Sequence, residues 1–283
     1  MAEYFTARGL PVPRELRRTP LTDWRRWGTL ALTLLIIYVG LRITDIDLSR
    51  ANPGYASQVF LSLFRWDFSI LGPQNEFETF WDGAFGLMIV TIFLGIVATA
   101  FAVIAALPLS FLGARNIMTG NPVTAAIYTG TRLVFTIIRS IDVLIVVILF
   151  TVIFGLGSAA GVFALAFHNI GVLGKLYSEA IEGIDSGPGE AITATGANRF
   201  QVIWTAVVPQ IFNPFISFSI YRLDTNVRLA PIIGLVGGGG IGVLLFQTIN
   251  LFEYDKAGLI IFMIVVTVAA MDFFSAHVRK RLI

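Results

Sequence analysis

Hydrophobic residues in this 283-residue chain gather in long uninterrupted runs rather than alternating with polar positions. Residues 83–114 and 143–174 contain no Asp, Glu, Lys or Arg at all. A helix of about 20 apolar residues crosses the hydrocarbon core of a bilayer. The pattern therefore predicts an all-α, polytopic membrane protein with about six transmembrane helices.

Proline, glycine and charged positions divide the apolar runs into elements. The expected spans cover residues 24–43, 85–107, 139–156, 159–177, 210–235 and 256–276, and an interfacial helix covers about 122–137. Pro108 is expected to end the second span because proline lacks an amide donor. The sequence from Gly155 to Ser158 predicts a tight outer turn between the third and fourth spans.

The distribution of charge predicts the orientation in the membrane. Arginines are frequent in residues 1–26, the C-terminal tail 279–281 is basic, and segment 44–82 is mostly acidic. Lys and Arg favour the cytoplasmic side, so both termini are expected in the cytoplasm and the acidic segment outside. The predicted domains are a cytoplasmic segment (1–26), a first transmembrane helix with an extracytoplasmic loop (27–84), and a core of five transmembrane helices (85–283).

Composition excludes several functional classes. With 56% hydrophobic and 13% charged residues, the chain is neither disordered nor a water-soluble enzyme. It has no cysteine and two histidines, so neither a catalytic residue nor a metal site is expected. The glycine run 237–240 lacks the Gly-Lys-Ser/Thr ending of a phosphate loop. Because the basic excess adjoins apolar spans, we expect contact with membrane lipid and none with nucleic acid.

The polar segment 178–209 predicts two short helices joined at a glycine. Asp185 or Ser186 can cap the first helix, and Pro188 suits its first turn. Gly196 can take the left-handed conformation that ends a helix. A second, amphipathic helix over 198–207 places four apolar side chains on one side. These side chains are Phe200, Ile203, Trp204 and Val207.

The same segment carries a resemblance to a known family. Glu190-Ala191, Gly196 and Pro209 stand at the spacing of the Glu-Ala-Ala loop of ABC-importer permeases. The departures from its pattern, at Ile192, Ala206 and Val208, are conservative. The resemblance implies a type I permease fold in which this loop docks on an ATPase dimer that holds ATP and magnesium. The implied coupling residues are Glu190, Ala191, Gly196, Ala197, Phe200 and Pro209. It also implies an extracytoplasmic binding protein and a second copy of the chain.

A second resemblance concerns the substrate. Residues 173–182, 221–228 and 235–242 are similar to phosphonate-importer permeases, which implies import of phosphonate, and of phosphite or phosphate as related anions. Charges inside a span are functional candidates, and the fifth span carries Arg222, Asp224 and Arg228. The candidate residues of the substrate pathway are Arg222, Asn226 and Arg228. Helical spacing places Arg222 and Asn226 on one face, and lets Asp224 pair with Arg228 at i,i+4.

Other interpretations remain for these features. Arg222 has no acidic partner at helical spacing, so it is the better candidate to meet the anion, and the alternative is that it bonds backbone carbonyls of a neighbouring helix. His168 is expected to pack rather than to relay protons. Arg139 and Asp142 suit a surface ion pair. A secondary transporter or channel for a small anion is the alternative function, and it would not need a cytoplasmic docking loop. An intramembrane enzyme is not favoured, since no nucleophile and base share a helix face.

Overall fold

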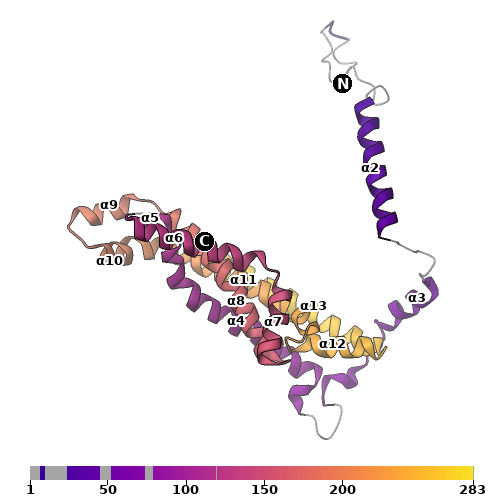
Figure 1. Ribbon diagram of the computed structural model, residues 1–283. Helices are drawn as coiled ribbons and strands as arrows, with labels where there is room; N and C mark the ends of the chain where they lie inside the picture. Colours follow the sequence, from indigo (N-terminus) through magenta and orange to yellow (C-terminus); the bar gives the residue numbers. More distant parts are fainter. Residues whose placement is uncertain (1–6, 10–23, 45–51, 74–78, 119, 283) are drawn as a thin grey trace. The chain divides into compact units, whose positions relative to one another are not determined.

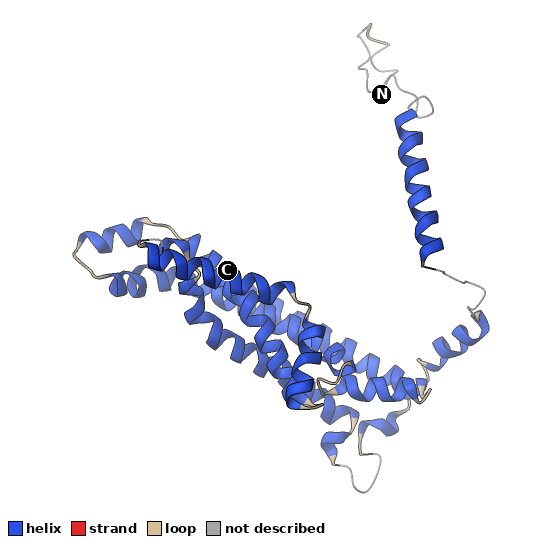
Figure 2. Cartoon of the chain, in the orientation of Figure 1, coloured by secondary structure: helices blue, strands red, loops and turns tan. Residues whose placement is uncertain are grey.

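The computed structural model describes residues 7–9, 24–44, 52–73, 79–118 and 120–282. Over these ranges the chain is helical and contains no strand (Figure 2). The chain divides into two compact units, residues 1–57 and 58–283. Most of the basic N-terminal segment and part of the acidic segment 44–82 lie outside the described residues, so the predictions made for them are not tested.

The first unit contains helix α2 (Trp24–Ile43) and the start of α3 (Pro53–Ser62). Helix α2 has 20 residues and coincides with the predicted first span. From Trp27 onward its large apolar side chains are exposed, including Ile36 at 63%. A helix that is apolar all round suits hydrocarbon or a protein partner as its surroundings.

The second unit is a bundle of long helices with shorter connecting elements (Figure 1). Its elements are η2 (Phe68–Leu71), η3 (Phe80–Asp82), α4 (Ala84–Leu112), α5 (Arg115–Met118), α6 (Pro122–Ser140), α7 (Val143–Phe154), α8 (Ser158–Glu182), α9 (Gly187–Ala194), α10 (Arg199–Val202), the π-helical turn η4 (Ile203–Val207), α11 (Val208–Leu235), α12 (Ile241–Asn250) and α13 (Tyr254–Leu282). In Figure 1, α9 and α10 form one end of this unit, and α12 lies toward the other.

Four helices in the described residues are long and apolar enough to cross a membrane, namely Ala84–Leu112, Ser158–Glu182, Arg199–Leu235 and Tyr254–Lys280. A fifth span results if α6 and α7, bent by 92° against each other, count as one. Helix α2 adds a shorter apolar segment. The prediction of an all-α polytopic membrane protein is confirmed.

Small residues allow the helices of the second unit to pack closely. A Cβ added to Gly95 of α4 would lie 2.9 Å from the Val227 side chain of α11. The same addition to Gly174 of α8 would strike the ring of Phe135, which is 1% exposed. Within a membrane, helix association depends on such close van der Waals packing. Glycine at these positions therefore holds α4, α6, α8 and α11 together.

The prediction that Pro108 ends the second span is wrong, because α4 continues to Leu112. A proline inside a helix removes one hydrogen bond and tends to kink it. The turn after Pro108 is nevertheless packed, since Ser110 is fully buried and Phe111 contacts an apolar core cluster. Tertiary packing of the following turn therefore outweighs the lost hydrogen bond.

The predicted third span, 139–156, is also wrong at its start. The helix begins at Val143 because the Asp142 carboxylate accepts a hydrogen bond from the Leu144 amide at 2.8 Å and caps it. No ion pair joins Arg139 to Asp142 among the described residues. Helix α7 has 12 residues, or about 18 Å at 1.5 Å per residue, so it is too short to span alone.

Two glycine turns meet at the end of the unit that includes α12. Gly155 and Gly157 have φ of 81° and 142°, which confirms the predicted tight turn between α7 and α8. The Gly157 amide donates to the Gly237 carbonyl at 2.9 Å. The Ile241 amide donates to Thr91 Oγ1 at 2.8 Å. The glycine run 237–240 is therefore a close-packed connection from α11 to α12.

Candidate coupling segment and buried polar chain

The segment that follows α8 contains the first candidate coupling residues. Helix α9 begins at Gly187 after Ser186, and Pro188 lies in its first turn, as predicted. Glu190 also lies in this first turn, near the positive end of the helix dipole. Glu190 and Ala191 are both exposed. The first turn of α9 therefore presents a carboxylate at the surface of the protein.

Gly196 supplies the sharp turn after α9. Its φ is +84°, which confirms the predicted left-handed conformation. No atom lies within 4 Å of a Cβ added at this position. Glycine is therefore required here by the backbone conformation and not by crowding. Any side chain in this conformation raises the free energy of the fold by about 1–2 kcal/mol.

The second half of the segment differs from the prediction. The sequence predicted a separate helix over 198–207, followed by a new span after Pro209. This prediction is wrong, because α10, η4 and α11 form one continuous helix from Arg199 to Leu235. The Val208 amide donates to the Ile203 carbonyl, which is a π-helical hydrogen bond. Pro209 lies in the first turn of α11, directly after this change of pattern. The missing proline donor is therefore accommodated without breaking the helix.

Gln210 ties the beginning of the segment to its end. Its side-chain oxygen accepts from the Asp185 amide at 3.0 Å, and its side-chain nitrogen donates to the Asp185 carbonyl at 3.3 Å. The same nitrogen donates to the Ala206 carbonyl at 2.9 Å. Sequence reasoning did not single out Gln210, since the backbone amide that it meets lies 25 residues away. This contact, here called the Gln210 clamp, fixes the base of the projecting segment.

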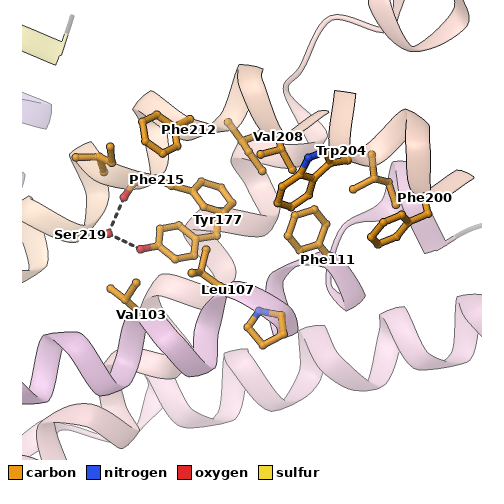
Figure 3. Close-up of a pocket in the computed structure, with 14 residues that line it drawn as sticks. Val103, Leu107, Phe111, Tyr177, Phe200, Trp204, Val208, Phe212, Phe215 and Ser219 are labelled. Atoms are coloured by element: carbon orange, nitrogen blue, oxygen red, sulfur yellow. Dashed lines mark hydrogen bonds between the residues drawn. The ribbon is translucent and has the colours of Figure 1, made fainter. Parts of the chain in front are cut away.

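An apolar cavity of about 570 Å³ lies beside the segment (Figure 3). Phe200 and Trp204 line it and are 74% and 67% exposed. On its other side Tyr177 stacks on Phe215 with ring centroids 4.1 Å apart, and its hydroxyl bonds to Ser219 Oγ at 2.6 Å. The predicted apolar side of 198–207 is confirmed for Phe200, Ile203 and Trp204, which all line this cavity.

Val207 departs from that pattern. It is 7% exposed and belongs to an apolar core cluster rather than to the wall of this cavity. It lines a second cavity, which also contacts Ala197 and Arg199. The π-helical turn changes the rotation per residue, so a side chain at its end does not follow the 100° spacing. The predicted position of Val207 is wrong for this reason.

Ionic contacts hold the end of α8 beside the candidate coupling segment, which comprises α9 and α10. Arg132 of α6 lies 2.6 Å from a carboxylate oxygen of Glu182, and its Nε donates to the Gly113 carbonyl at 2.8 Å. The other oxygen of Glu182 accepts from the Arg115 amide at 2.7 Å. Asn116 donates to the Ile181 carbonyl at 2.7 Å. These contacts join α5, α6 and α8 around the position where the segment leaves the bundle.

A chain of buried polar side chains crosses the middle of the bundle. Arg222 of α11 donates through Nε to Asn169 Oδ1 at 2.8 Å, and its Nη2 also contacts this oxygen. Asn169 of α8 donates to Asn226 at 2.9 Å, and Asn226 donates to Thr99 of α4 at 2.8 Å. All four residues are at most 9% exposed. Arg222 and Asn226 share one helix face, as predicted.

Arg222 is not the unpaired side chain that the sequence suggested. Its partner is the side-chain carbonyl of Asn169, 53 positions away in the sequence, rather than a backbone carbonyl. Because Asn169 was not singled out as a candidate, this bond was missed. Arg222 stabilises the packing of α8 against α11, and its contact with a transported anion stays a prediction.

Arg228 lies in a different environment. Its Nη2 is 3.6 Å from Asp224 Oδ2, which confirms the predicted i,i+4 pair, and donates to Asp272 Oδ1 of α13 at 2.5 Å. The side chains of Arg228 and Asp272 are 53% and 49% exposed, whereas that of Asp224 is 9% exposed. Sequence reasoning missed Asp272 because it lies 44 residues further along the chain.

The described residues contain no group of three or more His, Cys, Asp or Glu side chains placed to hold a metal ion.

A comparison with protein families identifies the family to which the chain belongs. Residues 117–283 match the family described as "Binding-protein-dependent transport system inner membrane component". The chain belongs to this family. The family predicted from the spacing of Glu190, Gly196 and Pro209 is thereby confirmed.

Two curated relatives of this transport component are similar over most of its length. It is 35% identical over 253 residues to a phosphate-import permease protein of Mycolicibacterium smegmatis, covering 87% of this chain and 45% of that protein. It is 31% identical over 288 residues to a phosphite transport system permease protein of Stutzerimonas stutzeri, covering 99% of both chains. The chain thus spans less than half of the first relative and nearly all of the second.

A solved structure shares the fold of this transport component. The inward-facing MetNI methionine ABC transporter matches with a TM-score of 0.61 at 21% identity, covering 69% of this chain and 94% of that chain. The likeness confirms the predicted type I ABC-importer permease fold. At this level of identity it shows the fold alone.

Proposed function

We propose that this chain is the membrane permease of an ATP-driven importer for a phosphorus oxyanion of the phosphonate, phosphite or phosphate class. The observation that carries the proposal is the connection of α9 and α10 to the core. The projecting segment is fixed at its base by the Gln210 clamp and continues into α11 without a break. A continuous helix transmits displacement along its length, so docking at α9 can move a span that carries Arg222 and Arg228.

The proposed partners follow from this arrangement. A dimer of ATP-binding subunits docks on the segment that contains Glu190, Ala191, Gly196, Ala197 and Phe200, and it holds the ATP and magnesium. Hydrolysis takes place on that partner, and this chain contributes no catalytic residue. A binding protein delivers the substrate from outside. Both termini are in the cytoplasm, and the chain resides in the cytoplasmic membrane.

A second copy of this chain completes the proposed pathway. Arg228 and Asp272 are about half exposed on helices that are long and apolar enough to span. Charges that face hydrocarbon are costly, so this face requires another polypeptide or water beside it. A homodimer that encloses a path between two such faces supplies both. It also presents two coupling segments to the two ATP-binding subunits.

The substrate class rests on the relatives and on the residues of α11. The two relatives named above are described as permeases for phosphate and phosphite. Residues 221–228 are similar to phosphonate-importer permeases in sequence and contain two arginines. Arginine is suited to phosphorus oxyanions because it is always charged and binds through several planar donors.

The competing function is a secondary transporter or channel for a small anion. Such a protein needs no cytoplasmic projection, which favours the ATP-driven importer. The test is co-purification of the chain with the ATPase and the binding protein encoded beside it, followed by measurement of ATP hydrolysis. Phosphonate-loaded binding protein should raise the rate severalfold. An ATPase that does not bind this chain, or whose rate is indifferent to the loaded protein, would contradict the proposal.

A further inference from the structure

A hydrogen bond between Arg228 and Asp272 joins α11 to α13. The same guanidinium nitrogen also lies near the carboxylate of Asp224. Arg228 Nη2 donates to Asp272 Oδ1 at 2.5 Å and lies 3.6 Å from Asp224 Oδ2. The side chain of Asp224 is 9% exposed, whereas that of Asp272 is 49% exposed. The carboxylate of Asp224 is therefore enclosed, whereas that of Asp272 has open space beside it into which it can rotate.

The exposed pair lies within the membrane-spanning part of both helices. Arg228 is seven residues before Leu235, the last residue of α11, or about 10 Å along the axis. Asp272 lies within the apolar helix Tyr254–Lys280. Because charged side chains avoid hydrocarbon, this face borders water or another polypeptide rather than lipid, as a path between two copies of the chain would provide.

Most of the donors of Arg228 remain open. A guanidinium carries five N–H groups, and both carboxylate contacts use Nη2. In the part of the chain that the structure describes, no hydrogen bond or ion pair involves Nε or Nη1 of Arg228. Three N–H donors are thus available to a ligand that reaches the guanidinium.

Arg222 does not offer the same opportunity. It is 9% exposed, and its Nε and Nη2 are directed to Asn169. An anion that reached Arg222 would have to displace a neutral amide from a packed interior. At Arg228 it would exchange with an exposed carboxylate of the same charge sign. Exchange of one anion for another leaves the guanidinium neutralised throughout.

We propose that Asp272 is a displaceable counter-ion and that Arg228 is the transient oxyanion site of the pathway. This inference rests on the proposed import function. An entering phosphorus oxyanion takes the place of the Asp272 carboxylate and uses the open donors of Arg228, while Asp224 stays in position. The return of Asp272 then expels the anion. Competition of this kind keeps binding weak, which a conducting pathway requires.

The test uses the complete complex in proteoliposomes and measures methylphosphonate taken up per ATP hydrolysed. Arg228→Gln should lower this ratio at least tenfold, while hydrolysis stimulated by loaded binding protein stays within twofold of wild type. Asp272→Asn should also lower the ratio because no carboxylate returns to expel the anion, and Asp272→Glu should restore it. Lys256→Gln, which removes an ion pair to Glu253 at the start of α13, is the matched control and should change nothing.

If the ion pair of Arg228 and Asp272 only holds α11 and α13 together, other results are expected. The exchanged pair, Arg228→Asp with Asp272→Arg, would restore a tie, and recovery of transport in this variant would overturn the proposal. A wild-type ratio in Arg228→Gln, or loss of assembly in every variant of the pair, would overturn it as well. Failure of the import function itself is distinguishable, because the wild-type complex would then show no ATP-dependent uptake.

Discussion

The side chain of Gln210 forms a reciprocal pair of hydrogen bonds with the backbone of Asp185, accepting from its amide at 3.0 Å and donating to its carbonyl at 3.3 Å. Asp185 lies just before α9, and Gln210 lies in the first turn of α11. The two residues therefore enclose the whole coupling segment. Under the proposed function, a displacement of α9 would reach the core through this pair as well as through the continuous helix.

Loss of the Gln210 clamp should loosen the segment without affecting the bundle. Gln210→Ala removes three hydrogen bonds, each worth about 1 kcal/mol net. We expect faster amide hydrogen exchange over residues 187–202 and a severalfold loss of transport at unchanged membrane insertion. Gln247→Ala on α12, which lies toward the other end of the unit, is the control. Unchanged exchange in the Gln210 variant would show that the clamp does not hold the segment.

Gly196 and Gly189 provide a matched pair within the coupling segment. Gly196 has φ of +84°, whereas Gly189 lies inside helix α9 and has no positive φ. Gly196→Ala should cost about 1–2 kcal/mol locally and reduce co-purification of the ATPase, and Gly189→Ala should be neutral. Quantification of ATPase bound per permease tests this difference. Equal effects of the two substitutions would contradict the role assigned to the turn.

Asn169 is expected to be the most sensitive member of the buried polar chain. It accepts from Arg222 and donates to Asn226, and it is fully buried. Asn169→Leu leaves the Arg222 guanidinium and the side-chain oxygen of Asn226 without a partner, and each unsatisfied buried group costs about 1–3 kcal/mol. We expect a clear fall in the thermal unfolding temperature, whereas Asn250→Leu at the exposed end of α12 should leave it unchanged.

Arg222→Gln separates the two interpretations of Arg222. If the residue only supports packing, the variant should lose stability and assembly together with transport. If it also meets the anion, an assembled complex should hydrolyse ATP and transport poorly. The contacts with Asn169 favour the first result. Thermal unfolding and uptake measured on the same preparation distinguish them.

The membrane orientation can be tested by labelling, since the chain has no native cysteine. Cysteines introduced singly at Ala7 and Ala56 should react with impermeant reagents from opposite sides. The expectation follows from the arginine-rich N-terminus and the acidic segment 44–82. Labelling of both positions from the same side would refute the proposed topology.

Local signals in the sequence predicted the features that depend on neighbouring residues. Hydrophobic runs predicted the long helices, and the position of Gly196 between two predicted short helices predicted its left-handed conformation. The i,i+4 spacing predicted the contact of Asp224 with Arg228. Each of these depends on residues within about one or two helical turns. Helical periodicity is sufficient to place such residues relative to one another.

Features that depend on tertiary contacts could not be predicted in the same way. Asp272 reaches Arg228, and Asn169 reaches Arg222, across 44 and 53 residues of sequence. Pro108 does not end its helix, because the packing of the next turn outweighs the missing donor. The π-helical turn before Pro209 turned a predicted helix boundary into a continuous helix. In each case the deciding partner lies on another element or in an irregular turn.

The most direct test of the account is ATP-dependent uptake by the reconstituted complex. Proteoliposomes contain this chain with its ATPase, and the loaded binding protein is added on the side opposite the ATPase. The account predicts that radiolabelled methylphosphonate accumulates only when ATP is present on the ATPase side, and that Gly196→Val abolishes the accumulation. Uptake at the same rate without ATP, or without the binding protein, would contradict it and would favour a secondary transporter or channel.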